Sequence, residues 1–339
     1  MSEFIVVTSI NHPTECLKAF THGAVANGSS LLIAGDRKSP ADFYLPGSQF
    51  ISLDEQISRF PKFAALLPRD SYTRKNVGYL AAMQGGATLI IDTDDDNAPL
   101  PGFWVTANRA VSGQLVARAG WVNAYSYFSD SIIWPRGFPL DEVRAPGSKP
   151  IPGLNGNYVC PVQQGLADDN PDVDAIYRLL MPLPVRFKHA ENIVLGKGAW
   201  CPFNSQNTKW WPEVFPLLYL PAYCSFRMTD IWRSFVAQRI IWENGWHLSF
   251  HSSTVYQQRN EHNLMRDFED ETSGYLNNSK IRDALDSLDL RSGVENHGDN
   301  LHRCYHALVN LGVIGRGELE LLTAWISEVE ALKTPTKMT

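Results

Sequence analysis

Four carboxylates follow an apolar run near residue 90. The run Ala87–Ile91 is rich in β-branched residues and leads directly into Asp92, Asp94, Asp95 and Asp96. The pattern predicts a buried strand, and the charges at its carboxyl end would repel one another unless a cation lay among them. Carboxylate oxygens suit a hard divalent ion, Mg²⁺ or Mn²⁺, and the Asp92-x-Asp94 spacing indicates a metal with a bound diphosphate. A solvated acidic turn explains this run equally well when it is taken alone.

Two other predicted strands end near polar residues. The strand Phe4–Ser9 carries Thr8 at its end, and the strand Leu31–Ala34 is followed by Asp36 and Lys38. Strands and helices alternate here with short turns, which predicts an α/β fold with a mostly parallel sheet and flanking helices. Because ligands of such sheets bind beyond the carboxyl ends of the strands, we expect these strand ends to converge on one crevice.

Composition indicates an ordinary globular protein. The chain has 339 residues, 44% of them hydrophobic, and a formal net charge of −6 without a dense block of Lys or Arg. Neither nucleic acid nor an anionic membrane surface is therefore favoured as a partner. The five cysteines are widely spaced and form no C-x-x-C pair, which favours a reducing compartment. No long apolar run predicts a transmembrane segment, so we expect a cytoplasmic location, with peripheral membrane attachment as the alternative.

The later chain contains several further predicted elements. Helices are expected at Tyr72–Gln84, at Trp210–Leu220 and at Ile231–Asn244, the last of which stops before Gly245. A strand is predicted at Trp246–Phe250, and the chain from about residue 263 to 332 has a helical pattern throughout. The stretch between residues 99 and 161 is irregular and rich in Gly, Pro and aromatic residues, which is typical of functional loops.

Seven blocks of the sequence carry a resemblance to a known family. They are Gly35–Pro40, Asp70–Leu80, Asp92–Asp96, Trp134–Gly137, Gln163–Leu166 with Pro171–Asp174, Asn204–Thr208 and Arg227–Arg233. In this order the blocks resemble the STELLO-type glycosyltransferases and, more distantly, the plant reversibly glycosylated polypeptides that act as UDP-arabinopyranose mutases. The resemblance covers roughly residues 4 to 262, whereas the tail after residue 263 matches no pattern that we can place.

The resemblance implies a GT-A-like, Rossmann-type catalytic domain over residues 1–262, followed by a helical C-terminal extension over 263–339. It also implies a nucleotide-sugar donor, first of all a UDP-sugar, a carbohydrate or glycan acceptor, and Mn²⁺ or Mg²⁺ at the acidic run. STELLO proteins are Golgi-membrane proteins in plants, and no membrane anchor is expected here. The acceptor and the location are therefore not carried over from the family.

Candidate site residues follow from the strand ends and the matched blocks. The predicted metal ligands are Asp92, Asp94, Asp96 and His251, with Asp95 able to replace one of the acids. The predicted substrate-binding residues are Thr8, Asp36, Lys38, Arg74, Lys75, Asn76, Asp172, Asp174, Asn204 and Gln206. The predicted catalytic base is Asp230, because an inverting transferase needs one carboxylate to accept the proton of the acceptor hydroxyl.

Several of these residues also have simpler interpretations. Asp230 is as well explained by capping of the helix that starts beside it. Arg74 and Lys75 at a helix start indicate an anionic partner, but they also fit a solvated helix face. Turn chemistry explains Asp36, and a structural role is the commoner one for a lone histidine such as His251.

Three functions are compatible with these patterns. The leading hypothesis is a metal-dependent glycosyltransferase, in which cations neutralise the leaving diphosphate and a carboxylate deprotonates the acceptor. The second is a nucleotide-sugar mutase, which would leave the nucleotide attached to the sugar. The third is a non-catalytic partner protein that keeps the fold, and the complete Asp92–Asp96 cluster argues against it.

Overall fold

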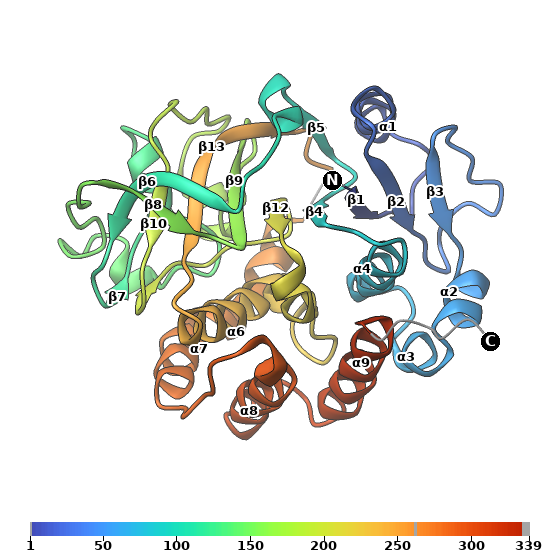
Figure 1. The fold of residues 1–339 in the computed structure, drawn as a ribbon. Helices are drawn as coiled ribbons and strands as arrows, with labels where there is room; N and C mark the ends of the chain where they lie inside the picture. Colours follow the sequence, from blue (N-terminus) through green and yellow to red (C-terminus); the bar gives the residue numbers. More distant parts are fainter. Residues whose placement is uncertain (1, 261–262, 334–339) are drawn as a thin grey trace.

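The computed structural model describes residues 2–260 and 263–333. Its N-terminal half is a parallel sheet in which four strands lie side by side. In order across the sheet they are β3 (Ser48–Ile51), β2 (Ser30–Ala34), β1 (Glu3–Thr8) and β4 (Leu89–Thr93). The α/β fold predicted from the alternating pattern is confirmed, because helices flank both faces of this sheet (Figure 1).

The strands face two different helices because side chains alternate along a strand. Ile5 and Val7 of β1 pack toward α1 (Glu15–Asn27), and Val6 between them packs toward α4 (Lys75–Gln84). Thr14 caps the start of α1, because its hydroxyl accepts the Leu17 N–H, and Gly28 with a φ of 69° caps the end. On the α4 side, the 3-10 turn Tyr72–Arg74 leads into the helix, so the predicted helix Tyr72–Gln84 has an irregular first turn.

The sheet continues from β4 into a mixed half. Its strands follow in the order β12 (Asn207–Trp210), β9 (Val162–Asp168), β13 (Leu248–Gln257), β10 (Ile193–Leu195), β6 (Ala110–Val116) and β8 (Asn155–Val159). The short strand β5 (Asn97–Pro99) pairs with the end of β13, and β7 (Gly120–Trp121) and β11 (Ala199–Trp200) form a separate ribbon. β12 runs antiparallel to both of its neighbours, β4 and β9.

The two central strands β9 and β12 were not among the predicted strands. Gln164 in β9 is buried and uses its amide group inside the sheet: Oε1 accepts the Asn204 N–H and the Thr208 hydroxyl, both at 2.9 Å. The predicted helix Trp210–Leu220 is also wrong, since Trp210 ends β12 and a 3-10 segment Pro212–Leu218 follows. Pro216 inside that segment cannot donate a helical hydrogen bond.

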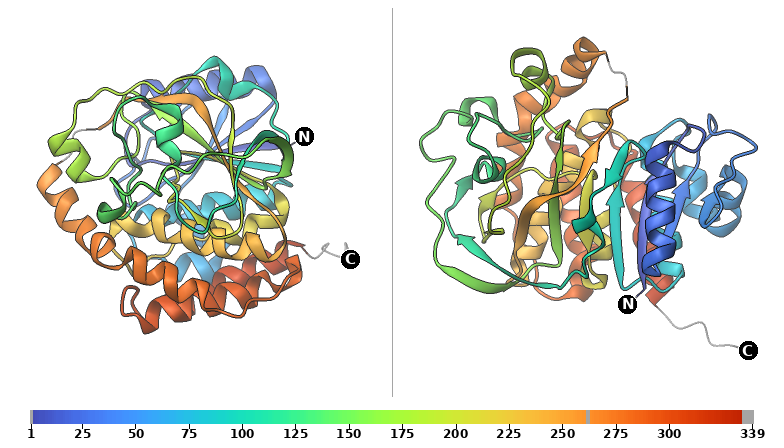
Figure 2. Two further views of the ribbon diagram at one scale, coloured as in Figure 1. Left: turned by 90° about the vertical axis from the view of Figure 1, so that its left-hand side faces the viewer. Right: turned by 90° about the horizontal axis from the view of Figure 1, so that it is seen from above.

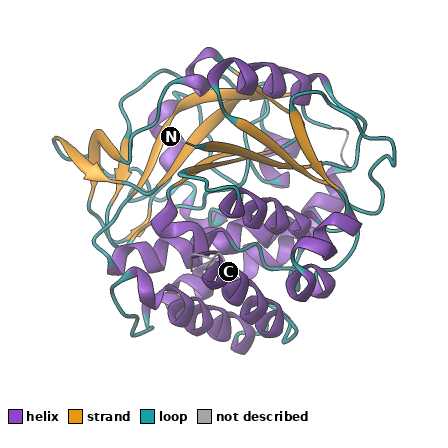
Figure 3. Cartoon of the chain, turned by 45° about the vertical axis from the view of Figure 1, so that its right-hand side comes forward, coloured by secondary structure: helices purple, strands orange, loops and turns teal. Residues whose placement is uncertain are grey.

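Most helices cover one face of the sheet. They are α2 (Leu53–Arg59), α3 (Pro61–Leu66), α4, α6 (Thr229–Glu243), α7 (Leu264–Asp286), α8 (His297–Asn310) and α9 (Glu318–Lys333). The left view of Figure 2 shows α1 in blue above the strands and most of the helices below them, and Figure 3 shows the same larger group of helices on the lower side of the strands. α6 agrees with the predicted helix Ile231–Asn244 to within two residues, and Gly245 beyond it has a φ of 69°.

The C-terminal helices share a core with the rest of the protein. Trp325 of α9 is fully buried and its ring lies 5.6 Å from that of Phe63 and 5.8 Å from that of Tyr219. The buried Glu318 accepts the backbone N–H groups of Ala222 and Tyr223 at 2.9 and 2.7 Å. The predicted division of the chain at residue 262 stays a prediction, and residues 261 and 262 lie outside the described residues. No described helix combines the length and the apolar character needed to cross a bilayer.

Candidate active site

A pocket of about 410 Å³ lies beyond the carboxyl ends of β1, β2 and β4. Its position is the one predicted from the polar residues that follow these strands. Eight predicted site residues line it, namely Thr8, Asp36, Lys38, Asp94, Asp96, Asp172, Gln206 and Asp230. The pocket therefore brings together residues that are separated by more than 200 positions in the sequence.

The acidic side of the pocket is formed by Asp94, Asp95 and Asp96, which directly follow β4. Asp94 accepts hydrogen bonds from the Tyr72 hydroxyl at 2.8 Å and from Lys75 Nζ at 3.0 Å. Burial raises the pKa of Asp94 to about 7, and the nearby carboxylates add to this shift while Lys75 opposes it. Proton uptake is thus one response of this cluster to the crowding of negative charge, and binding of a cation would be another.

Neighbouring polar groups fix the other two acids. Asp95 Oδ2 accepts the Ser9 hydroxyl at 2.5 Å and the Asn11 amide at 3.1 Å. Asp96 accepts Gln257 Nε2 at 3.1 Å on both carboxylate oxygens, and burial raises its pKa. In its ionised form the Asp96 carboxylate can only accept, and the amide nitrogen of Gln257 faces it accordingly.

Gln257 leaves a buried acceptor at the pocket. Its side chain is 8% exposed and lines the pocket, and Oε1 has no hydrogen-bond partner among the described residues. A buried acceptor without a partner is costly, so a donor from a bound ligand or a metal ion would be favourable here. Gln257 was not predicted, because it ends β13 at a position that no matched block covers.

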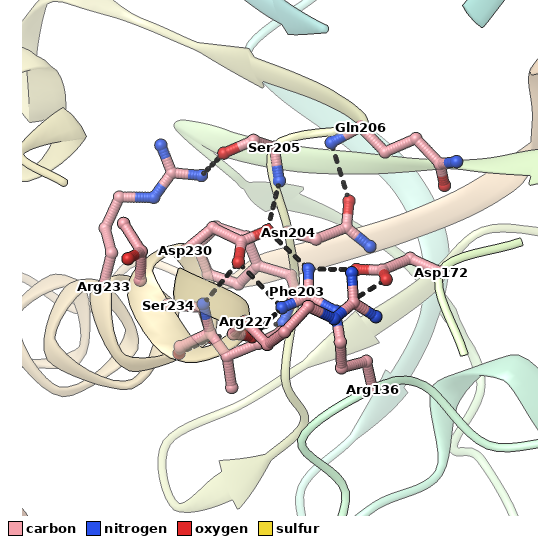
Figure 4. A network of polar contacts seen from close by, with 12 residues as sticks. Arg136, Asp172, Phe203, Asn204, Ser205, Gln206, Arg227, Asp230, Arg233 and Ser234 are labelled. Atoms are coloured by element: carbon pink, nitrogen blue, oxygen red, sulfur yellow. Dashed lines mark hydrogen bonds and ion pairs between the residues drawn. The ribbon is translucent and has the colours of Figure 1, made fainter. Parts of the chain in front are cut away.

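Another part of the pocket wall is organised by Arg136. Its Nε and Nη2 donate to the two oxygens of Asp172 at 2.7 and 2.8 Å, and Nη1 and Nη2 donate to those of Asp230 at 3.0 and 2.9 Å (Figure 4). Nη1 also donates to the backbone carbonyl of Arg227. One guanidinium thus holds two carboxylates, an arrangement that raises the pKa of Arg136 although burial alone would lower it. We call Arg136, Asp172 and Asp230 the pocket-wall cluster.

Asp230 has two sets of partners. α6 starts one residue earlier at Thr229, its N-cap residue Met228 makes no side-chain cap hydrogen bond, and the Asp230 carboxylate accepts the first-turn N–H of Ile231 at 3.1 Å. The same carboxylate also accepts Arg136 and the Ser205 N–H, the latter at 3.2 Å. Burial would raise the pKa of Asp230, but Arg136, Arg233 and the Ser205 N–H together lower it below its usual value. Asp230 is therefore ionised at neutral pH.

Asp92 and Lys75 lie behind the pocket rather than in it. Asp92 forms an ion pair with Lys75 Nζ at 2.6 Å through one oxygen and accepts Arg233 Nη1 at 2.9 Å on the other, and neither Asp92 nor Lys75 is exposed. We call Asp92, Lys75 and Arg233 the enclosed cluster. Asp92 lies inside β4, whereas Asp94 on the same face lies beyond its end and reaches the pocket. Both oxygens of Asp92 therefore already have cationic partners from the protein.

Four further predicted residues support the backbone around the pocket. Arg74 donates to the carbonyls of Ala64, Leu67 and Pro68, and Asn76 bonds to both backbone groups of Leu220. Asp174 caps α5 (Ala175–Leu180) through the Tyr177 N–H at 2.7 Å and accepts the Trp134 indole N–H at 2.6 Å. Asn204 Oδ1 accepts the Gln206 N–H at 2.9 Å. None of the four lines the pocket.

His251 lies away from the acidic side. It is in the middle of β13 opposite Gly165, six residues before Gln257, and its Nδ1 donates to the Ser252 carbonyl at 2.9 Å. Burial and the nearby Lys209 lower the pKa of His251 to about 4. Within the described parts of the chain, no three His, Cys, Asp or Glu side chains are grouped so that they could hold a metal ion.

Several pocket residues were not predicted individually. They are Ser9, Asn11, Tyr72, Arg136, Phe226, Arg227, Gln257 and Arg259. Arg136, Tyr72 and Arg227 lie within blocks that carry the family resemblance, so the blocks contained a signal for them. Phe226 is 56% exposed, and its ring packs edge-to-face on Tyr72 with 5.9 Å between the ring centres. The pocket therefore combines carboxylates, guanidinium groups and an aromatic rim.

The fold and the pocket define an α/β protein with a charged strand-end binding site, and comparison with known proteins adds a family. The model of the STELLO glycosyltransferases matches residues 227–336. The chain is 30% identical to "Probable glycosyltransferase STELLO2" of Arabidopsis thaliana over 336 residues, which is 92% of this chain and 41% of the relative. It is also 30% identical to "Probable glycosyltransferase STELLO1" of the same plant, over 75% of this chain and 35% of the relative.

These matches confirm the resemblance to the STELLO family over most of the chain. They also correct the expectation that the tail matches no known pattern, because the family model covers α7, α8 and α9. The chain spans less than half the length of the two curated relatives. Among solved structures, the similar ones include "M. tuberculosis glucosyl-3-phosphoglycerate synthase", at 8% identity, with a TM-score of 0.42 over 83% of this chain and 80% of the other.

Proposed function

We propose that this chain is a glycosyltransferase unit that moves a sugar from a nucleotide-sugar donor to an acceptor hydroxyl. The similarity to two probable glycosyltransferases supports the reaction class. The observation that carries the proposal is the strand-end pocket, which is lined both by Asp94–Asp96 and by a wall built around Arg136. A nucleotide-sugar has anionic phosphates and many hydroxyl groups, and such a pocket offers donors and acceptors for both.

We further propose that a divalent cation, Mn²⁺ or Mg²⁺, binds with the donor. The donor set fits a hard ion of this kind, because Asp94 and Asp96 offer carboxylate oxygens and the orphaned Oε1 of Gln257 lies beside them. Mg²⁺ is commonly held by only one or two carboxylates, with water and phosphate oxygens completing its shell. When bound, the ion would neutralise charge on the diphosphate leaving group. Asp94 and Asp96 are the residues that would hold it.

On the acceptor side, Asp230 is the proposed base. Its carboxylate lines the pocket, and it is ionised, which is the form that can accept a proton. Arg136 contacts both oxygens of Asp230, so it lowers the proton affinity of the carboxylate and also fixes its orientation. Asp172 holds the other edge of the same guanidinium. Arg136 and Asp172 would therefore orient the base.

A binding experiment tests the donor and the metal together. UDP, ADP and GDP are added to the purified protein with Mn²⁺, and the melting temperature is measured before and after EDTA. A ligand that binds only the folded state at 100 times its Kd adds about 2.7 kcal/mol to the free energy of unfolding. We expect one diphosphate to raise the melting temperature and EDTA to remove most of this rise. Equal stabilisation after complete chelation would contradict the role of the metal.

A further inference from the structure

Helix α7 belongs to the C-terminal helical segment, yet one of its faces reaches the arginine side of the pocket. It packs on the 3-10 segment Phe226–Met228 and on α5. Asp267 and Glu271 lie one turn apart on α7, with exposures of 6% and 0%. Each holds an arginine that lines the pocket: Asp267 accepts Arg259 Nη2 at 3.0 Å, and Glu271 accepts Arg227.

Glu271 is held by donors on both of its oxygens. Oε1 accepts Arg227 Nε at 2.9 Å and Nη2 at 2.7 Å. Oε2 accepts the Ala175 N–H at 2.7 Å and the Tyr275 hydroxyl at 2.5 Å. The carboxylate therefore connects α7 with the start of α5, which follows Asp172, and with the arginine that precedes α6. A buried acid with four donors has little freedom to move.

Arg227 is held along one edge only. Its Nε and Nη2 face Glu271, whereas Nη1 has no hydrogen-bond partner in the residues that the structure describes. The side chain is 8% exposed and lines the pocket, and the backbone carbonyl of the same residue accepts Arg136. The Glu271 contact thus fixes the plane of a guanidinium whose remaining donors are available to a ligand. Such a fixed, planar group matches the oxygens of a phosphate.

We propose that Glu271 is a positioning residue that holds Arg227 for contact with the diphosphate of the donor, so that α7 completes the binding site. The inference rests on the proposed donor. Without the carboxylate, the guanidinium is free to turn toward other acids that line the same pocket, such as Asp96 or Asp172. A phosphate contact would then be formed only after the side chain is reoriented, which weakens binding.

Calorimetric titration with UDP and Mn²⁺ tests this role in six proteins. Arg227→Gln removes the proposed contact, and we expect UDP to bind roughly 10-fold or more weakly. Glu271→Gln keeps the shape of the side chain but not its charge, and we expect a loss of about 3- to 10-fold. Glu271→Asp keeps the charge and should recover part of the affinity. Glu269→Gln changes an exposed acid of the same helix and should leave binding unchanged.

The double variant Arg227→Gln/Glu271→Gln distinguishes positioning from an independent effect. If Glu271 acts through Arg227, the double variant binds UDP as weakly as Arg227→Gln alone. Losses that multiply, or wild-type affinity in a folded Glu271→Gln protein, would overturn the proposal. If Glu271→Gln does not fold, the Glu271→Asp protein decides, since a shortened clamp must also weaken UDP binding. A wild-type protein that binds no nucleoside diphosphate would instead contradict the proposed donor.

Discussion

The enclosed cluster and the pocket-wall cluster use the same kinds of groups for different purposes. In the enclosed cluster one carboxylate, Asp92, lies between two cations, and in the pocket-wall cluster one cation, Arg136, lies between two carboxylates. Side chains of the first are 0 to 1% exposed, and those of the second are 7 to 9% exposed and line the pocket. Only the second can contact a ligand without a rearrangement of the core.

The excess charge of each cluster also differs in sign. Asp92, Lys75 and Arg233 together carry one positive charge in excess. Lys75 also forms an ion pair with Asp94. Arg136 with Asp172 and Asp230 has one negative charge in excess at the pocket. The first cluster is enclosed and the second lines the pocket. We therefore expect that removing one member of the first cluster lowers the stability of the fold, and that removing one member of the second impairs function.

Asp230→Asn should give the largest effect, and it should affect turnover. Loss of a general base predicts a fall in kcat of roughly 10²- to 10⁴-fold with the affinity for the donor preserved. Arg136 keeps Asp172 as a partner, so the free energy of unfolding should fall by only about 1–2 kcal/mol. Turnover and donor affinity are measured on one preparation. Activity within a few-fold of wild type would leave the base unassigned.

Asp92→Asn should reverse this pattern. Arg233 loses its carboxylate partner while it stays buried, and Lys75 keeps only Asp94. Breaking a buried ion pair by removal of one member typically costs about 3–5 kcal/mol. Urea unfolding of the variant and of wild type gives the difference in free energy of unfolding. A loss below about 1 kcal/mol would show that the enclosed cluster is not needed for stability.

The sequence was sufficient to predict the parallel half of the fold and the position of the pocket. The apolar runs of β1, β2 and β4 have a clear signal, and their polar ends meet where a parallel sheet requires. β9 and β12 could not be predicted in this way. Where they pair, they carry Gln163, Gln164 and Thr208, each of which has at least one hydrogen-bond partner that lies far away in the sequence.

The roles of individual acids were less predictable than the cluster as a whole. Asp92 and Asp94 are two residues apart and share a face of β4, so the pattern alone could not show which of them passes the end of the strand. Arg233, the partner of Asp92, lies 141 residues from it in the sequence. His251 lies on β13, six residues before Gln257, the residue of this strand that lines the pocket. The strand β13 is twice as long as the predicted strand. Strand length decides which residues reach the pocket.

Asp94→Asn should give the smallest effect and sharpens the comparison, because Asp94 contacts Lys75 of the enclosed cluster and also lines the pocket. Burial raises the pKa of Asp94 to about 7, whereas its value in an unfolded chain is about 3.9. Between these values the folded state binds the additional proton, so this group makes wild-type stability fall as pH rises from about 4 to about 7.

Asn does not titrate and lacks this contribution. The variant should therefore melt close to wild type at pH 4 and about 2–4 °C above it at pH 8, as measured by calorimetry without added metal. A difference that is the same at both pH values would show that Asp94 is ionised throughout, with Lys75 as a sufficient partner.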